Sequence, residues 1–256
     1  VTLNTSGAIG TSANRIQFAN NTNTAQQKVV IGDVTQPSGV YLDGLGTLTL
    51  GNISTNTGGG NVNVTARAGL NVNGTITTGS GTINLAADRT AADGADDGTG
   101  TLSLLASSSV SSTNTGADAI TLRGADLSID LTSGQEATVS AGGVGGGVRI
   151  FASAAAKTIE IGDTGASADL TVTDAELARI TTLDNLTIGE ATVQTGNITL
   201  TTMAPQSNAN VIVNQTSAGK ITLKDAGTAT ALDAGSGTIA LNAGSNGIEA
   251  TSTNNT

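Results

Sequence analysis

Aliphatic residues alternate with small polar residues in short runs along most of the chain, and most of these runs open on glycine. They are GTLTL (46–50), GNVNV (60–64), GTINL (81–85), GTLSL (100–104), DAITL (118–122), GNITL (196–200), GKITL (219–223) and GTIAL (237–241). Alternation with a period of two is typical of β-strands. Neighbouring runs mostly begin about 20 residues apart, and a recurrence at this interval predicts a stacked repeat.

One period, residues 60–80, holds three short alternating segments, separated by Ala-Gly at 68–69 and Asn-Gly at 73–74. We interpret it as one coil of a parallel β-solenoid with about three short strands per coil, whose corners use Gly and Asn because these residues accept a positive φ. The prediction is one all-β domain over 1–256, with clear repeats over 46–256 and less regular coils over 1–45. An antiparallel sandwich of hairpins explains the alternation equally well but explains the recurrence poorly.

The solenoid predicts stacked columns of inward aliphatic side chains. The predicted inward residues are Val62, Val64, Leu70, Val72, Ile76, Ile83, Leu85, Leu102, Leu104, Ile120, Leu122, Ile198, Leu200, Ile221, Leu223, Ile239 and Leu241. With about 20 residues per coil, some 13 coils spaced at about 4.8 Å would form a rod about 60 Å long.

The segment TVTDAELARITTLDNLTIG (171–189) departs from the strand pattern. Thr173 and Glu176 have the spacing of a capping box, which precedes Leu177 and Ile180. We therefore expect a short helical insert near 174–180 that packs Leu177 on the sheets, rather than a protruding binding element.

Composition narrows the chemistry. Glycine occupies 35 positions, whereas the chain has 2 Phe, 1 Tyr and no Trp, so the core must consist of thin aliphatic layers. This composition is also found in disordered chains, but a disordered segment has no reason to keep a period of two. Cysteine and histidine are absent, which excludes disulfides, Ser-His-Asp and Cys-His arrangements and histidine-rich zinc sites.

The net charge of −10 and the scattered basic residues argue against nucleic-acid binding, which needs clustered Lys and Arg. No apolar run approaches the length of a membrane span. The chain begins Val-Thr-Leu, without an initiator methionine or signal peptide, which we interpret as a mature or excised segment of a protein that works outside the cell.

The segments GNISTNTGGGNVNVTA, GLNVNGTITTGSGTINLAA and TDAELARITTLDNLTIG together resemble the repetitive shafts of large bacterial exoproteins similar to filamentous haemagglutinin. The resemblance covers most of residues 46–250, and residues 1–45 depart from its pattern. It implies a right-handed parallel β-helix, export through a partner pore, and a role in adhesion or surface architecture.

Two kinds of chemical site deserve a test. The loop AADRTAADGADDGTG brings Asp88, Asp93, Asp96 and Asp97 close together in sequence, and calcium prefers such oxygen ligands. The spacing is not that of an EF-hand, so a solvated acidic loop is the favoured interpretation. Acidic pairs suited to glycoside hydrolysis occur at Asp126/Asp130 and Glu160/Asp163, but three aromatic residues cannot line a sugar cleft.

Ice binding is a third possibility, because the pairs Thr47/Thr49, Thr75/Thr77 and Thr199/Thr201 have the Thr-x-Thr pattern. These pairs do not recur at one fixed position in successive coils, so we interpret the threonines as strand formers.

The sequence therefore predicts a non-catalytic structural or adhesive segment of a secreted bacterial surface fibre, with no catalytic, cofactor or metal residues. The alternative is a carbohydrate-binding or carbohydrate-acting β-helix protein. The expected partners are a second copy stacked end to end or a continuation of the chain, and a host, cell-surface or polysaccharide ligand.

Overall fold

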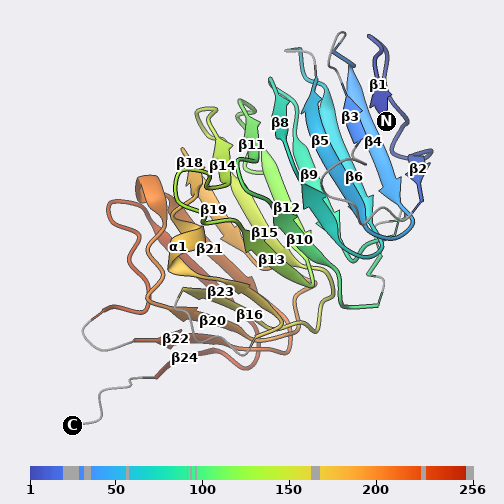
Figure 1. Ribbon diagram of the computed structural model, residues 1–256. Helices are drawn as coiled ribbons and strands as arrows, with labels where there is room; N and C mark the ends of the chain where they lie inside the picture. Colours follow the sequence, from blue (N-terminus) through green and yellow to red (C-terminus); the bar gives the residue numbers. More distant parts are fainter. Residues whose placement is uncertain are drawn as a thin grey trace.

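The computed structural model describes residues 1–19, 29–31, 36–55, 58–90, 92, 94–95, 97–162, 168–225 and 229–251. Within these residues the chain is almost entirely β-structure, arranged in three sheets (Figure 1). The named strands pair with one another in parallel throughout. The antiparallel alternative is therefore wrong.

The nine-stranded sheet contains, in spatial order, β2 (Ile16–Phe18), β4 (Gly39–Gly44), β6 (Asn61–Ala66), β9 (Ile83–Ala87), β12 (Ile120–Gly124), β15 (Val148–Ala152), β19 (Asn185–Ile188), β21 (Asn210–Gln215) and β23 (Ile239–Ala243). The ten-stranded sheet contains β13 (Asp126–Ile129), β10 (Thr101–Leu104), β7 (Leu70–Val72), β5 (Leu48–Ser54), β8 (Thr75–Thr78), β11 (Ser109–Ser112), β14 (Thr138–Ala141) and β18 (Ile180–Thr182), with β3 (Val29–Ile31) paired to β5 and β1 (Thr2–Leu3) paired to β3. The five-stranded sheet contains β17 (Leu170–Val172), β16 (Ile159–Gly162), β20 (Ile198–Thr201), β22 (Ile221–Lys224) and β24 (Ile248–Thr251).

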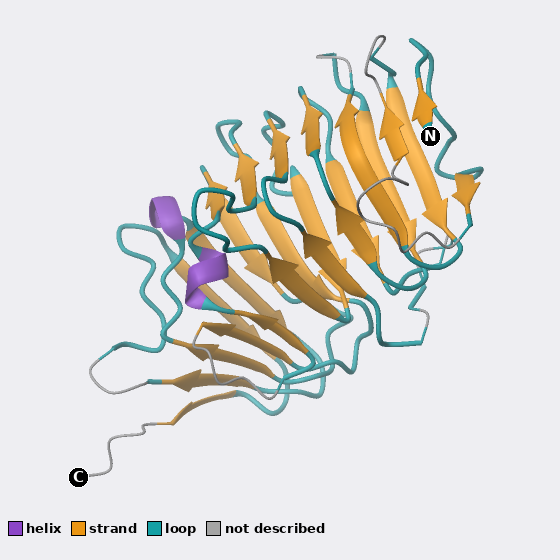
Figure 2. Cartoon of the chain, in the orientation of Figure 1, coloured by secondary structure: helices purple, strands orange, loops and turns teal. Residues whose placement is uncertain are grey.

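The chain visits the sheets in turn. From β6 it passes through β7 and β8 and returns to the nine-stranded sheet as β9, which pairs with β6. The ten-stranded sheet is two ladders that meet in β5, because Leu48 and Leu50 pair with β7 whereas Ile53 pairs with β8. Strands β1 and β2 lie at one end of the resulting stack, and β23 and β24 lie at the other (Figure 2).

The register of the nine-stranded sheet stacks aliphatic side chains on one another. One column crosses all nine strands and consists of Ile16, Leu42, Val64, Leu85, Leu122, Ile150, Ile188, Val213 and Leu241. Most of the side chains predicted to point inward are buried, so the period of two identified the core correctly. Burial of aliphatic side chains contributes most of the stability of such a stack.

Three of the predicted inward residues are not buried. Leu223 and Leu241 are half-buried, and Ile239 is 48% exposed. Ile239 pairs with Val211 in β21, but β23 is the last strand of its sheet in the described part of the chain. Ile239 therefore lies in the predicted inward column, but one side of it is open because no described strand covers β23.

The prediction of about 20 residues per coil is wrong for several coils. The register joins Val62 to Ile83, Ile120, Val148 and Leu186 in turn, and the steps to Ile120 and Leu186 are almost twice as long as the step to Ile83. The run at 100–104 pairs with 70–72 rather than with 81–85. Connections of unequal length separate the strands, and the longest uninterrupted ladder within the described residues has nine strands, compared with the expected 13 coils.

The Asn73-Gly74 corner has a different physical cause from the one predicted. Gly74 does not have a positive φ. A Cβ atom there would lie 2.7 Å from the carbonyl carbon of Gly51 in β5. Glycine is needed at this corner because two backbone segments approach closely.

The predicted helical insert is present as α1 (Asp174–Leu177), shorter than the expected range because Ile180 already belongs to β18. Its capping box is complete: Glu176 N donates to Thr173 Oγ1 over 3.2 Å, and Thr173 N donates to Glu176 Oε2 over 2.9 Å. Leu177 is fully buried, as predicted. Glu176 Oε1 also accepts a hydrogen bond of 2.9 Å from Ile129 N at the end of β13, which ties α1 to the neighbouring ladder.

The order of β16 and β17 is inverted relative to the chain. Strand β16 comes first in the sequence, yet it lies between β17 and β20. Strand β17 faces β13, where Thr171 N donates to Asp126 Oδ1 over 3.0 Å. The chain therefore skips one level of the stack and then returns to fill it.

Candidate functional site

A polar hollow of about 340 Å³ lies where four neighbouring strands of the nine-stranded sheet end, namely β9, β12, β15 and β19. Its polar lining residues are Arg89, Arg123, Ser153, Glu190 and Gln194, and its apolar ones are Ala92, Ala152, Ala155 and Val193. Parallel strands end at the same edge of a sheet, so residues that follow them meet there although they are far apart in sequence.

Arg123 is the most constrained charged group of this hollow. Its side chain is only 8% exposed. Nη1 donates to Glu190 Oε2 over 2.8 Å and to the Ala152 carbonyl over 3.3 Å. The guanidinium carbon lies 4.9 Å from the centre of the Phe151 ring, and Phe151 is the register partner of Arg123 in β15. The ion pair and the cation–π contact hold the guanidinium in one position.

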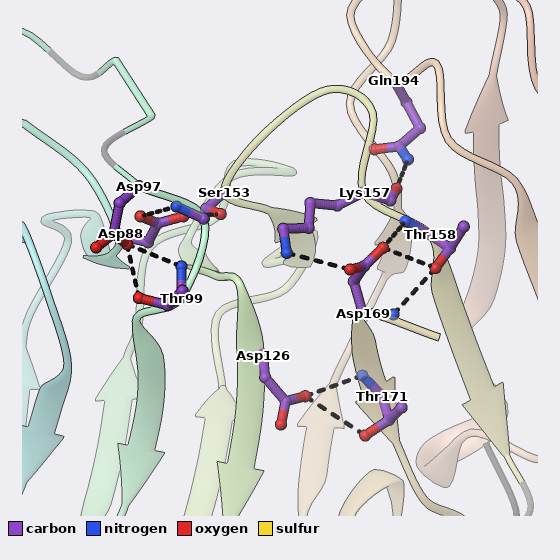
Figure 3. A network of polar contacts seen from close by, with 11 residues as sticks. Asp88, Asp97, Thr99, Asp126, Ser153, Lys157, Thr158, Asp169, Thr171 and Gln194 are labelled. Atoms are coloured by element: carbon purple, nitrogen blue, oxygen red, sulfur yellow. Dashed lines mark hydrogen bonds and ion pairs between the residues drawn. The ribbon is translucent and has the colours of Figure 1, made fainter. Parts of the chain in front are cut away.

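Ser153 lines the hollow, and its hydroxyl is bonded to Asp88, which lies behind the lining (Figure 3). Asp88 follows β9 with a φ of 55° and is fully buried. Its Oδ1 accepts from Gly98 N over 2.8 Å, and its Oδ2 accepts from the Ser153 hydroxyl. Arg89 Nη1 donates to the Ser153 carbonyl over 2.5 Å. Both arginines of the hollow are thus anchored on backbone at the end of β15 or just after it.

A second group of polar contacts, also drawn in Figure 3, precedes β16 and β17 of the five-stranded sheet. Gln194 Nε2 donates to the Lys157 carbonyl over 2.6 Å, and Lys157 Nζ lies 3.1 Å from Asp169 Oδ1. Thr158 donates to Asp169 Oδ2 from both its backbone nitrogen and its hydroxyl, each over 2.9 Å. The backbone hydrogen bond of Thr158, with smaller contributions from Lys157, holds the pKa of Asp169 below its ordinary value of 3.8.

A second hollow of about 240 Å³ adjoins the first and shares Glu190 with it. Arg149, Phe151, Thr187 and Asn214 are among its lining residues. Three of the ten basic residues of the chain, Arg89, Arg123 and Arg149, therefore line these two adjoining hollows.

The acidic loop does not bring its described carboxylates to one point. Asp88 is used by Gly98 and Ser153, and Asp97 Oδ1 accepts from the backbone nitrogen and hydroxyl of Thr99 (Figure 3). Asp93 and Asp96 lie outside the described residues. Across the described ranges, no group of three or more acidic side chains is placed to hold a metal ion.

The acidic pairs considered for glycoside hydrolysis are not assembled by the described residues. Asp126 and Asp130 stand four positions apart along an extended segment, which separates their Cα atoms by about 13 Å. Asp126 accepts from Thr171, and Asp130 accepts from Thr132 N over 2.8 Å. Glu160 is buried and accepts from the Thr201 hydroxyl over 3.1 Å, whereas Asp163 lies outside the described residues.

The three Thr-x-Thr pairs do not stack on one another, as expected, but one of them belongs to a longer column of hydroxyl residues. The register stacks Thr75 and Thr77 of β8 on Ser109 and Ser111 of β11, and these on Thr138 and Ser140 of β14. Serine as well as threonine supplies this column, so a search for threonine alone does not reveal it. Thr77 Oγ1 and Ser111 Oγ lie 3.3 Å apart, so hydroxyls of adjacent strands bond to each other. Thr47/Thr49 and Thr199/Thr201 belong to other ladders.

Sequence reasoning missed the hollow altogether. Arg123 and Glu190 are 67 residues apart, and the polar lining residues come from separate connections of unequal length. Only the strand register places them together. The one available signal was that basic residues follow or end several strands of the same sheet.

Comparison of the chain with protein-family models, with curated proteins and with solved structures gives no match in any of the three. The part of the chain that the structure describes includes no helix with the length and apolarity needed to cross a membrane.

Proposed function

We propose that the chain is a right-handed parallel β-solenoid with about three short strands per coil, and that it forms a non-catalytic structural or adhesive segment of a secreted bacterial surface fibre. The observation that carries the proposal is the aliphatic column from Ile16 to Leu241, which crosses nine parallel strands without a polar interruption. A stack of this kind gains stability from each added strand, which suits an extended shaft.

The composition supports the same proposal. A protein without disulfides that works outside the cell needs another source of stability, and long parallel ladders supply one. The resemblance to shafts of exoproteins similar to filamentous haemagglutinin gives this architecture a role in adhesion or surface structure.

Immunogold electron microscopy with antibodies against the 256 residues tests the proposed location. We expect gold particles along fibres or on the outer surface of intact source cells. Label confined to the cytoplasm of sectioned cells would overturn the proposal.

The edge strands β23 and β24 support end-to-end addition of strands. Ile239 and Ile248 are each 48% exposed and lie at the edges of two sheets in the described chain. An uncovered parallel edge favours pairing with a further strand. We propose that a continuation of the chain or a second copy supplies it, and that in the second case the contact repeats head to tail.

Light scattering coupled to size exclusion, run as a concentration series on the 256 residues, distinguishes these two sources. A second copy predicts a mass that rises with concentration. A constant monomeric mass would exclude stacking of copies. If, in addition, β23 and β24 exchange their amide hydrogens as slowly as β9 and β12, the edge is stable alone and neither source is needed.

A further inference from the structure

We propose that the hollow between Arg89, Arg123 and Glu190 is a binding site for a sugar that carries a carboxylate, of the hexuronate class. The inference deepens the adhesive part of the proposed function and rests on it. It assigns recognition and no reaction, because Glu190 is the one carboxylate that lines this hollow in the described structure.

The charge of the hollow favours an anion. The whole chain has a net charge of −10. Around the hollow, the described arginines Arg89, Arg123 and Arg149 outnumber the carboxylates of Glu190 and the buried Asp88 by one. A concave positive site on an acidic protein concentrates anions where the rest of the surface repels them.

The arginines are held in place before any ligand arrives. Arg123 is fixed by Phe151, by the Ala152 carbonyl and by Glu190. Arg89 is fixed by the Ser153 carbonyl. Guanidinium groups bind carboxylates through paired N–H donors, and a group that is already ordered loses little conformational entropy on binding.

Glu190 adds a hydrogen-bond acceptor to the two arginines, which are donors. Its side chain is 35% exposed, so the carboxylate is accessible although it is paired with Arg123. A carboxylate in this position accepts hydrogen bonds from hydroxyl groups. A ligand that has both a carboxylate and several hydroxyls matches an arginine pair beside a glutamate.

The size and the apolar walls favour a sugar over a small inorganic anion. The volume of about 340 Å³ is at the lower end of the range for small-molecule sites, about 300–1,000 Å³. Ala92, Ala155 and Val193 provide aliphatic walls, which suit the C–H faces of a pyranose ring.

Two-dimensional ¹⁵N NMR of the full 256-residue chain tests the site. The probes are glucuronate and galacturonate, with glucose and galactose as neutral counterparts and acetate and inorganic phosphate as plain anions. We expect uronates at about 10 mM or less to shift the amides of Arg89 and Ala92 and those at 152–155 and 190–194, and the other probes to bind at least about tenfold more weakly. Added salt should weaken the uronate response.

Variants assign the response to the hollow. Arg89→Gln should weaken uronate binding at least about tenfold, whereas Lys220→Gln, which removes the same charge from a distant ion pair, should change it less than about twofold. Arg123→Gln should act like Arg89→Gln; because Arg123 is packed on Phe151 and this variant could misfold, the conclusion depends on Arg89→Gln.

Three results would each overturn the inference: no shift with either uronate, equal binding of a uronate and its neutral counterpart or a plain anion, or full uronate binding by Arg89→Gln. None of them bears on the proposed fibre location, which the immunogold experiment tests separately.

Discussion

The hydroxyl of Ser153 donates to the buried carboxylate of Asp88 across 65 residues of chain, and this bond joins the end of β15 to the end of β9. We predict that Ser153→Ala lowers the free energy of unfolding by about 2–3 kcal/mol, because a buried carboxylate loses a donor. Urea unfolding at pH 7 measures the change. Thr99→Ala removes a hydroxyl donor from the exposed Asp97, where water can replace it, and should cost clearly less. Equal costs for the two variants would contradict the prediction.

Ile83 and Ile239 occupy one column of the nine-stranded sheet but differ completely in exposure, at 0% and 48%. We predict that Ile83→Asp lowers the free energy of unfolding by several kcal/mol, since it places a charge between aliphatic layers. Ile239→Asp should cost less than about 1 kcal/mol. Thermal or urea unfolding measures both costs, and an unchanged transition for Ile83→Asp would show that the register is wrong.

Gly162 and Gly134 both have a positive φ, of 95° and 77°, but only Gly162 is closely packed. A Cβ atom at Gly162 would lie 1.5 Å from the Thr201 carbonyl oxygen, whereas at Gly134 nothing lies within 4 Å. We predict a cost of about 1–2 kcal/mol for Gly134→Ala, from backbone strain alone. Gly162→Ala should cost at least about twice as much, because β16 and β20 must separate. Similar unfolding midpoints for the two variants would argue against the close approach of these strands.

The lowered pKa of Asp169 predicts that the free energy of unfolding decreases at acidic pH. Because its pKa is lowered in the folded protein, its stabilising contribution is fully present above its ordinary pKa of 3.8 and is lost as the pH falls through the lowered value. The Asp169 side chain is 41% exposed, so we expect less than about 1 kcal/mol. Asp169→Asn should reduce stability at pH 7 and converge with the unmodified chain near pH 2.

Lys157→Gln provides the control for this pH series. The backbone nitrogen of Thr158 is the largest cause of the lowered pKa, and it remains in this variant. Most of the acid dependence should therefore persist. Its complete loss in Lys157→Gln would show that the ion pair, rather than the hydrogen bonds of Thr158, controls the titration.

Short-range patterns predicted the structure well. The alternation identified the buried faces of the strands, and the three-residue spacing from Thr173 to Glu176 identified the capping box of α1. Both features depend on local geometry, which fixes what residues two or three positions apart can contact. Neither pattern predicted the hydrogen bond between Ile129 N and Glu176 Oε1, because this bond depends on how α1 is placed beside β13.

Long-range relationships were not accessible in the same way. The long steps from Ile83 to Ile120 and from Val148 to Leu186 interrupt the apparent period of the glycine-led runs, so the sequence pattern could not supply the register. Without the register, nothing in the sequence indicates that Arg123 and Glu190 form an ion pair. Exposure at an edge, as at Ile239, is likewise a property of the position in the sheet and not of the residue type.

The inverted order of β16 and β17 has a mechanical consequence. If the chain is pulled from its C-terminal side, β24, β22 and β20 can peel away one at a time, each from a single neighbour. The next strand of this face along the chain is β17, which still lies between β13 and β16. Pulled from the N-terminal side, the chain reaches β16 while β17 and β20 still flank it. From either direction, the pulling force therefore reaches a strand that has neighbours on both sides. Removing this strand requires breaking the contacts on both of its edges at once, so we expect the inversion to resist stepwise mechanical unfolding in the middle of the stack.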